Sequence, residues 1–139
     1  ILNSDGFAAK EAVWGIADSH GIHHPELTYV MLPDGAGHDL AAGIEPGTQF
    51  DFGTDVEGRS ECIAIWAAPD IDVIPIAGFL DRPERLVVYG IEKGTLNMAG
   101  EEISHRIATV GGHAWCYDHL TDAAERLYKA GINWIMAAE

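Results

Sequence analysis

A run of strand-like segments from Thr48 to Val110 constrains the fold of this chain more than any other part of the sequence. Short stretches rich in Val, Ile and Phe alternate there with turn residues, which is typical of consecutive β-strands. Pro75 lies inside one of them and indicates an edge strand or a bulge, because proline cannot donate a ladder hydrogen bond. The predicted strands are Thr48–Gly53, Ser60–Ala68, Ile71–Leu80, Arg85–Ile91, Thr95–Met98 and Glu101–Val110.

One helix is predicted on each side of this run. The first spans Phe7 to His20, where apolar residues recur at helical spacing and Gly21 fits the position after the last turn. The second spans Asp118 to Ala130, with Asp118 as the N-cap and Gly131 as its end. The apolar segment Ile132–Ala137 is then predicted as a final strand.

Two further segments complete the predicted fold. Leu27–Leu32 is predicted as a strand, and Ala36–Gly47 as a long loop with one helical turn at Asp39–Ala42. The expected fold class is α+β in a single domain over residues 1–139. It consists of one mostly antiparallel, curved sheet of six to seven strands, with an N-terminal and a C-terminal helix packed on one face.

The charge of the chain excludes some classes of partner. The net charge is −14, with only eight Lys and Arg residues, so the surface repels nucleic-acid backbones and anionic membranes. No apolar run reaches the ~18 residues that a membrane-spanning helix requires. The two cysteines, Cys62 and Cys116, do not form a disulfide framework, and a reducing cytoplasmic location is expected. Whether a leader or tag preceded Ile1 is left open.

Histidine is the enriched reactive residue, with seven copies in the chain, and three of them are close together. His20, His23 and His24 follow the first predicted helix, and a turn there brings imidazoles close enough to share a metal ion. The alternative is that His20 interacts favourably with the helix dipole while the other two lie in a solvated turn.

A second cluster lies between the last strand of the run and the second predicted helix. It contains Cys116, His113, His119 and Asp118. Backbone amides at a helix N-terminus lower the pKa of a cysteine, so Cys116 is a candidate nucleophile with a histidine as base, or part of a metal site. The alternative is an aromatic packing corner capped by Asp118.

Two functions follow as hypotheses. The first is a small-molecule-binding domain with a pocket between sheet and helices, with catalysis left open and no cofactor implied. Its rim would be formed by the Ala36–Gly47 loop and the 113–119 corner. The candidate ligand-binding residues are His38, Trp66, Trp115 and Tyr117.

The second hypothesis is a non-catalytic homo-oligomeric assembly module. Two helices cover only one face of a six- or seven-stranded sheet, so the other face, with residues such as Phe50, Phe52 or Trp66, would remain partly exposed. Proteins seldom leave large apolar patches in water. A symmetric dimer, formed through this face or through Ile132–Ala137, is therefore expected.

Overall fold

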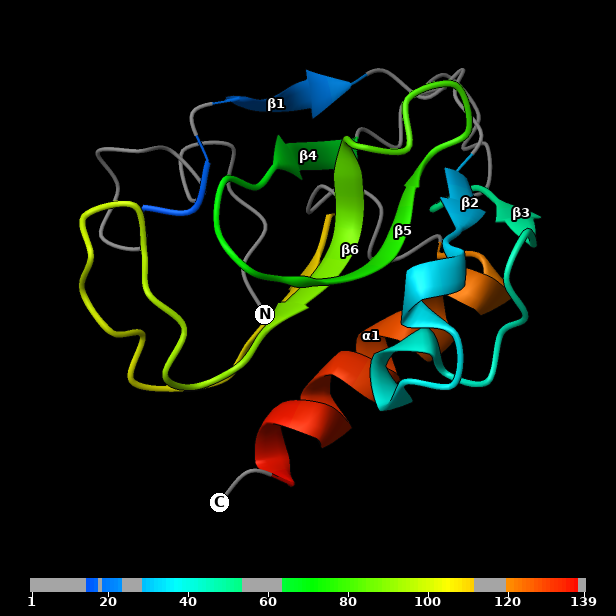
Figure 1. Cartoon of the computed structure of the whole chain (residues 1–139). Coiled ribbons are helices and arrows are strands. Elements are labelled where there is room, and N and C mark those ends of the chain that lie inside the picture. The colour runs from blue at the N-terminus through cyan, green and yellow to red at the C-terminus, as the bar shows by residue number, and fades with distance from the viewer. Residues whose placement is uncertain (1–14, 18, 24–28, 54–63, 112–119, 138–139) are drawn as a thin grey trace.

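A computed structural model of the chain describes residues 15–17, 19–23, 29–53, 64–111 and 120–137. Its strands form one antiparallel sheet, and its single α-helix in this part lies beside one face of that sheet (Figure 1). The α+β class with a mostly antiparallel sheet and a C-terminal helix is therefore confirmed. The strands are β1 (Ser19–His23), β2 (Tyr29–Met31), β3 (Gln49–Phe50), β4 (Ala64–Ala68), β5 (Ile74–Phe79), β6 (Leu86–Ile91) and β7 (Ile107–Val110).

The strand β6 is the centre of the sheet. The strand order is β1-β4-β6-β5-β2-β3, and β7 also pairs with β6. One edge of β6 meets β4 through Leu86 and meets β7 from Val88 to Ile91, while β5 pairs along the strand. All six residues of β6 are buried. Its apolar sequence suits a strand that is covered on both faces.

The strand β5 carries the irregularity that its proline predicts. Its register against β6 shifts between Pro75 and Ala77 and again between Ala77 and Gly78. A proline lacks the N–H that a regular ladder needs, so the shift lies where pairing is already interrupted. The strand is nevertheless internal, because β2 pairs with it on its other side.

The long loop after β2 forms two 3₁₀ turns, η1 (Pro33–Gly35) and η2 (Asp39–Ala41). The turn η2 confirms the helical turn predicted within the Ala36–Gly47 loop. The turn η1 packs closely on β5: a side-chain carbon at Gly35 would lie 2.5 Å from the Pro75 carbonyl oxygen. The turn η2 packs against α1, and the two lie side by side in Figure 1.

The helix α1 (Asp122–Met136) packs against β7 and η2. Its buried residues Ala124, Leu127, Gly131 and Trp134 are spaced three or four apart and form one stripe. The side chain of Thr121 caps the helix by accepting a hydrogen bond from the Ala124 amide. This stripe buries one face of the helix and leaves the opposite face in solvent.

The core has two parts, one on each face of the sheet. The part beneath α1 and the 3₁₀ turns includes Phe50, Phe52 and Trp66. The other part contains Leu86, Tyr89 and Ile91 of β6. Ile16, Ala17 and Ile103 pack with them. Both faces are therefore covered, and the expectation that Phe50, Phe52 or Trp66 would be exposed is wrong.

The predicted N-terminal helix is not seen in the described residues. Ser19 and His20 belong to β1, which pairs with β4 from Ser19↔Ala68 to His23↔Ala64. Gly15, expected inside the helix, has a φ of 54°, which a right-handed helix cannot contain. Pairing with the apolar strand β4 overrides the helical spacing of the sequence. The first part of the predicted helix, residues 7–14, lies outside the described residues.

The predicted final strand at Ile132–Ala137 is also wrong, because α1 continues through Gly131 to Met136. Gly131 lies on the buried stripe, and Trp134 extends that stripe by another turn. The helix starts at Asp122, after the Thr121 cap, and the proposed cap Asp118 lies outside the described residues. Thr95–Met98 forms no strand and contributes only an isolated bridge between Leu96 and Glu102.

The sheet is neither closed nor strongly curled, which corrects the expected curvature. Its outermost strands, β1 and β3, do not pair with each other. In the part of the chain that the structure describes, no helix combines the length and the apolar character that crossing a bilayer requires.

Candidate functional site

An open groove of about 490 Å³ runs between the loop at η2 and the helix α1. Loop and helix contribute opposite walls, so the groove depends on how η2 docks on α1. Its volume lies within the range of small-molecule sites, roughly 300–1,000 Å³. The lining residues are Asp39, Ala42, Arg126, Lys129, Ala130, Asn133, Trp134 and Ala137.

The helix wall of the groove is one face of α1. Arg126, Ala130, Asn133 and Ala137 follow one another at steps of four, three and four residues, which places them on the same side of a helix. The alanines keep this wall shallow, while the guanidinium and the amide provide its polar groups. The face therefore combines apolar surface with a few polar groups, as ligand sites commonly do.

A hydrogen bond across the groove fixes Arg126. Its Nη2 atom donates to the carbonyl oxygen of Ala42 at 2.7 Å. Ala42 has a φ of 55°, the only positive φ at a non-glycine residue in the described part of the chain. This left-handed conformation is unfavourable for alanine, and such strain often accompanies functional sites. Gly43, with a φ of 70°, continues the same turn beside the Arg126 side chain.

Trp134 joins the groove to the core. Its side chain is 4 % exposed, so only an edge of the indole reaches the groove. The guanidinium carbon of Arg106 lies 4.6 Å from the centre of the Trp134 ring, and Arg106 also donates to the Trp134 carbonyl oxygen and to Glu92. This cation–π contact and these hydrogen bonds hold the indole in place.

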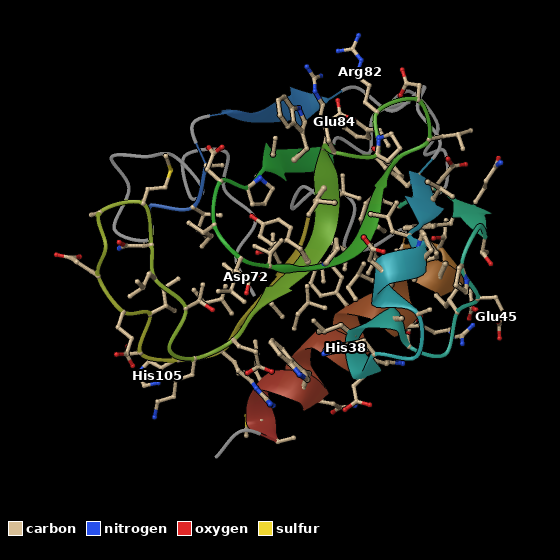
Figure 2. The ribbon with its side chains drawn as sticks, in the orientation of Figure 1. His38, Glu45, Asp72, Arg82, Glu84 and His105 are labelled. Carbon is tan, nitrogen blue, oxygen red and sulfur yellow. The ribbon has the colours of Figure 1, made fainter. Side chains whose placement is uncertain are left out.

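His38 lies at the entrance to η2, beside α1 (Figure 2). Its Nδ1 atom accepts a hydrogen bond from the Leu40 amide at 3.1 Å, which makes it the cap of the turn. In the neutral ring the proton is therefore on Nε2. The ring also meets the Trp134 ring edge-on, with 5.6 Å between the centroids. His38 thus supports the groove from behind rather than lining it.

The charged groups of the groove differ in whether they already have a partner. Lys129 pairs with Glu125 at 2.6 Å, one turn earlier on α1. The hydrogen bond and charge of Lys129 hold the pKa of Glu125 below its usual value, and Glu125 raises the pKa of Lys129 in the same way. Asp39 has no cation within ion-pair distance among the described residues. Asp39 and Arg126 are therefore the opposite charges left without an ionic partner there.

Only part of the predicted site falls within the described residues. His38 adjoins the groove, whereas Trp66 lies in the core and does not line the groove. The guanidinium carbon of Arg85 lies 4.2 Å from the centre of the Trp66 ring. His20 and His23 belong to β1 rather than to a turn after a helix. The other candidates lie outside the described residues: His24, His113, Trp115, Cys116, Tyr117, Asp118 and His119. Within the described ranges, no three His, Cys, Asp or Glu side chains group in a way that would hold a metal ion.

The spacing of residues in the sequence indicates the helix wall of the groove, but the predicted end of the helix at Gly131 prevented its recognition. Arg126, Lys129 and Asn133 share a helical face only if the helix continues past Gly131. A helix that ends at Gly131 separates Arg126 from Asn133 and Trp134, and the groove disappears. The apolar spacing of Leu127, Gly131 and Trp134 was the available evidence for the longer helix.

Comparisons of the chain with protein-family models, with curated proteins and with solved structures each returned no match.

Proposed function

We propose that this protein binds a small polar molecule in the groove between η2 and α1. The observation that carries the proposal is a pair of opposite charges, Asp39 on the loop and Arg126 on the helix, that line one groove of ligand size and have no ion-pair partner among the described residues. The carboxylate of Asp39 can accept hydrogen bonds and the guanidinium of Arg126 can donate more of them, so both groups are available to a ligand.

The groove is also preorganised for binding. Arg126 is held by the Ala42 carbonyl, Asp39 lies in a turn capped by His38, and Trp134 is fixed by Arg106. Binding therefore orders few new groups, which lowers its entropic cost. All the charged lining residues are exposed, so each contact is worth at most about 1 kcal/mol and the affinity for a small ligand is modest.

Nuclear magnetic resonance of the ¹⁵N-labelled chain tests this function. Small carboxylates, amines and amino acids are added one at a time, and the Trp134 indole N–H, the Asn133 amide group and the η2 amides are followed. We expect saturable shifts at these positions and none at Leu80 or Leu96, which are exposed but remote in sequence from the groove. Shifts confined to other parts of the chain, or none with any compound, would refute the proposed site.

A homo-oligomeric assembly role remains a second candidate, on a different observation. Ile132 and Met136, four residues apart on α1, are 51 % and 65 % exposed. Residues at this spacing form a continuous apolar strip on the helix surface. Sedimentation at micromolar concentration in low and high salt distinguishes the roles: a dimer that Met136→Lys dissociates supports assembly, and a monomer in both salts rejects it.

A further inference from the structure

The two charges of the groove that have no ion-pair partner among the described residues limit what its ligand can be. Lys129 is neutralised by Glu125, and the remaining charged lining residues are one carboxylate, Asp39, and one guanidinium, Arg126. We infer, on the basis of the proposed function, that the ligand is a small zwitterion with an ammonium and a carboxylate group, of the α-amino acid class. The ammonium pairs with Asp39 and the carboxylate with Arg126.

The hydrogen-bonding capacity of each charged group suits this assignment. Arg126 uses one N–H of Nη2 on the Ala42 carbonyl, and the guanidinium carries further N–H groups for a ligand carboxylate. Asp39 is exposed at the start of η2 and accepts hydrogen bonds only, as a partner of an ammonium must. The Asn133 amide both donates and accepts, so it is compatible with either end of the ligand.

The apolar part of the groove leaves room for the remainder of such a molecule. Ala42, Ala130 and Ala137 line it together with the edge of Trp134. These short side chains offer an apolar wall without filling the space. A ligand with a small apolar side chain beside its charged groups would cover this wall.

The charge of the whole protein decides between a zwitterion and a simple ion. With a net charge of −14, the chain repels a free anion, and Asp39 in the groove adds to that repulsion. A free amine is attracted by the overall field but meets the guanidinium of Arg126 in the groove. A zwitterion has no net charge for the field to oppose and gains a favourable contact with both Asp39 and Arg126.

Three probes that share the isobutyl side chain test this inference on the full chain. They are L-leucine, 4-methylpentanoate, which lacks its amine, and 3-methylbutylamine, which lacks its carboxylate. L-Alanine and L-phenylalanine are included because the side-chain size is not fixed by the charges. Titration followed at the groove resonances is expected to give a Kd for the best amino acid that is about fivefold lower than for either single-charge probe, since each lost exposed pair weakens binding by up to that factor.

Matched variants assign each contact. Asp39→Asn is expected to abolish the preference for leucine over 4-methylpentanoate, and Arg126→Gln the preference for leucine over 3-methylbutylamine. The controls are Asp34→Asn, in the first turn of η1, and Arg82→Gln, which Figure 2 places far from α1. Neither control residue lines the groove, so neither changes the preferences. A general disturbance of the fold would weaken all probes equally and lower the melting temperature.

The outcomes separate this inference from the function on which it rests. If 4-methylpentanoate or 3-methylbutylamine shifts the groove resonances with a Kd equal to or below that of every amino acid, the zwitterion assignment is wrong and the binding function stands. The same holds if the groove responds to other small polar molecules but to no amino acid. If no compound moves the groove resonances, both the assignment and the function are wrong.

Discussion

The indole of Trp134 lies against Gly90 of β6: a methyl group at Gly90 would be 3.2 Å from Cη2 of the ring and 2.4 Å from Cδ1 of Leu40. Gly90 thus allows the central strand, the helix α1 and the turn η2 to meet at one point. Leu40 and Trp134 are both buried there. The missing side chain is therefore a condition for the close docking that forms the groove.

Gly90→Ala is expected to lower the free energy of unfolding by about 1–3 kcal/mol, the usual cost of overpacking a core. The buried Leu40 side chain must move, and the indole ring, which lies under the Arg106 guanidinium, must give by a few tenths of an ångström. Urea denaturation measures the loss, and the Trp134 indole N–H resonance reports the shift. Gly37→Ala is the comparison, because Gly37 has a positive φ and no atom within 4 Å: it should cost about 1 kcal/mol through backbone strain and leave Trp134 unmoved. An unchanged Trp134 resonance in Gly90→Ala would contradict this packing.

Most of the fold was predictable where the local pattern and the tertiary pairing agree. The segments Arg85–Ile91 and Ile71–Leu80 alternate with clear turn residues, and β6 and β5 form within them. The helical turn at Asp39 was also predictable, from loop composition. Among the described residues some strand starts were predicted too early: β5 begins at Ile74 rather than Ile71, and β7 begins at Ile107 rather than Glu101.

The secondary structure of β1 and of the C-terminal half of α1 was mispredicted for one physical reason. At Ser19–His23 the helical spacing was real but weaker than pairing with β4, and at Gly131 a helix-breaking residue was tolerated because it lies on a buried stripe. Tertiary packing decided both cases, and one sequence does not reveal that packing. The helix wall of the groove was missed as a consequence, whereas the Ala36–Gly47 loop, which contributes Asp39 and Ala42, was expected at the rim of a pocket.

Tyr29→Phe is expected to stabilise the protein by about 1 kcal/mol. The Tyr29 hydroxyl is buried and has no hydrogen-bond partner among the described residues, while its ring packs against Phe52 at 5.0 Å between centroids. Removing an unsatisfied buried hydroxyl eliminates a desolvation cost and keeps the aromatic contacts. Calorimetry checks the change. Tyr128→Phe provides the contrast, because the Tyr128 hydroxyl donates to the Val110 carbonyl oxygen. A lower melting temperature for Tyr29→Phe would mean that the hydroxyl is satisfied.

Stability is expected to fall steeply above pH 10. Burial raises the pKa of Tyr89 to about 12, and the Thr109 hydroxyl offsets only part of that rise. Burial, reinforced by the charge of Asp51, also raises the pKa of Tyr29. The folded state therefore holds these protons more tightly than the unfolded state. Their contribution is complete below pH 10, the unfolded value, and is lost as the pH rises through the folded value.

For Tyr89 alone the loss is on the order of 3 kcal/mol, since one pKa unit corresponds to about 1.4 kcal/mol. Urea denaturation at a series of alkaline pH values measures it, and Tyr89→Phe should make the decline shallower. If tyrosinate absorbance showed all four tyrosines of the native protein ionising near pH 10, the argument would fail.

Thr121→Ala is expected to cost about 1–2 kcal/mol, the upper part of the range for a lost N-cap. The Thr121 hydroxyl accepts from the Ala124 amide and donates to the Asp51 carbonyl oxygen, so it ties the start of α1 to the segment after β3. Chemical denaturation measures the cost. Thr121→Ser keeps the hydroxyl and should recover most of the stability. Equal losses in the two variants would assign the effect to the methyl group instead.

The position of β6, paired on both edges and buried throughout, sets the order in which the backbone exchanges its amide hydrogens with water. Its amides should open only when the whole molecule unfolds, whereas the 3₁₀ turn at Asp39–Ala41, held by few backbone hydrogen bonds, should open locally and much faster. We therefore expect brief local openings of the loop wall, starting from the docked state that forms the groove, while the sheet remains intact. A ligand that bridges loop and helix would then be registered first as slower deuterium uptake at η2, with no change at β6.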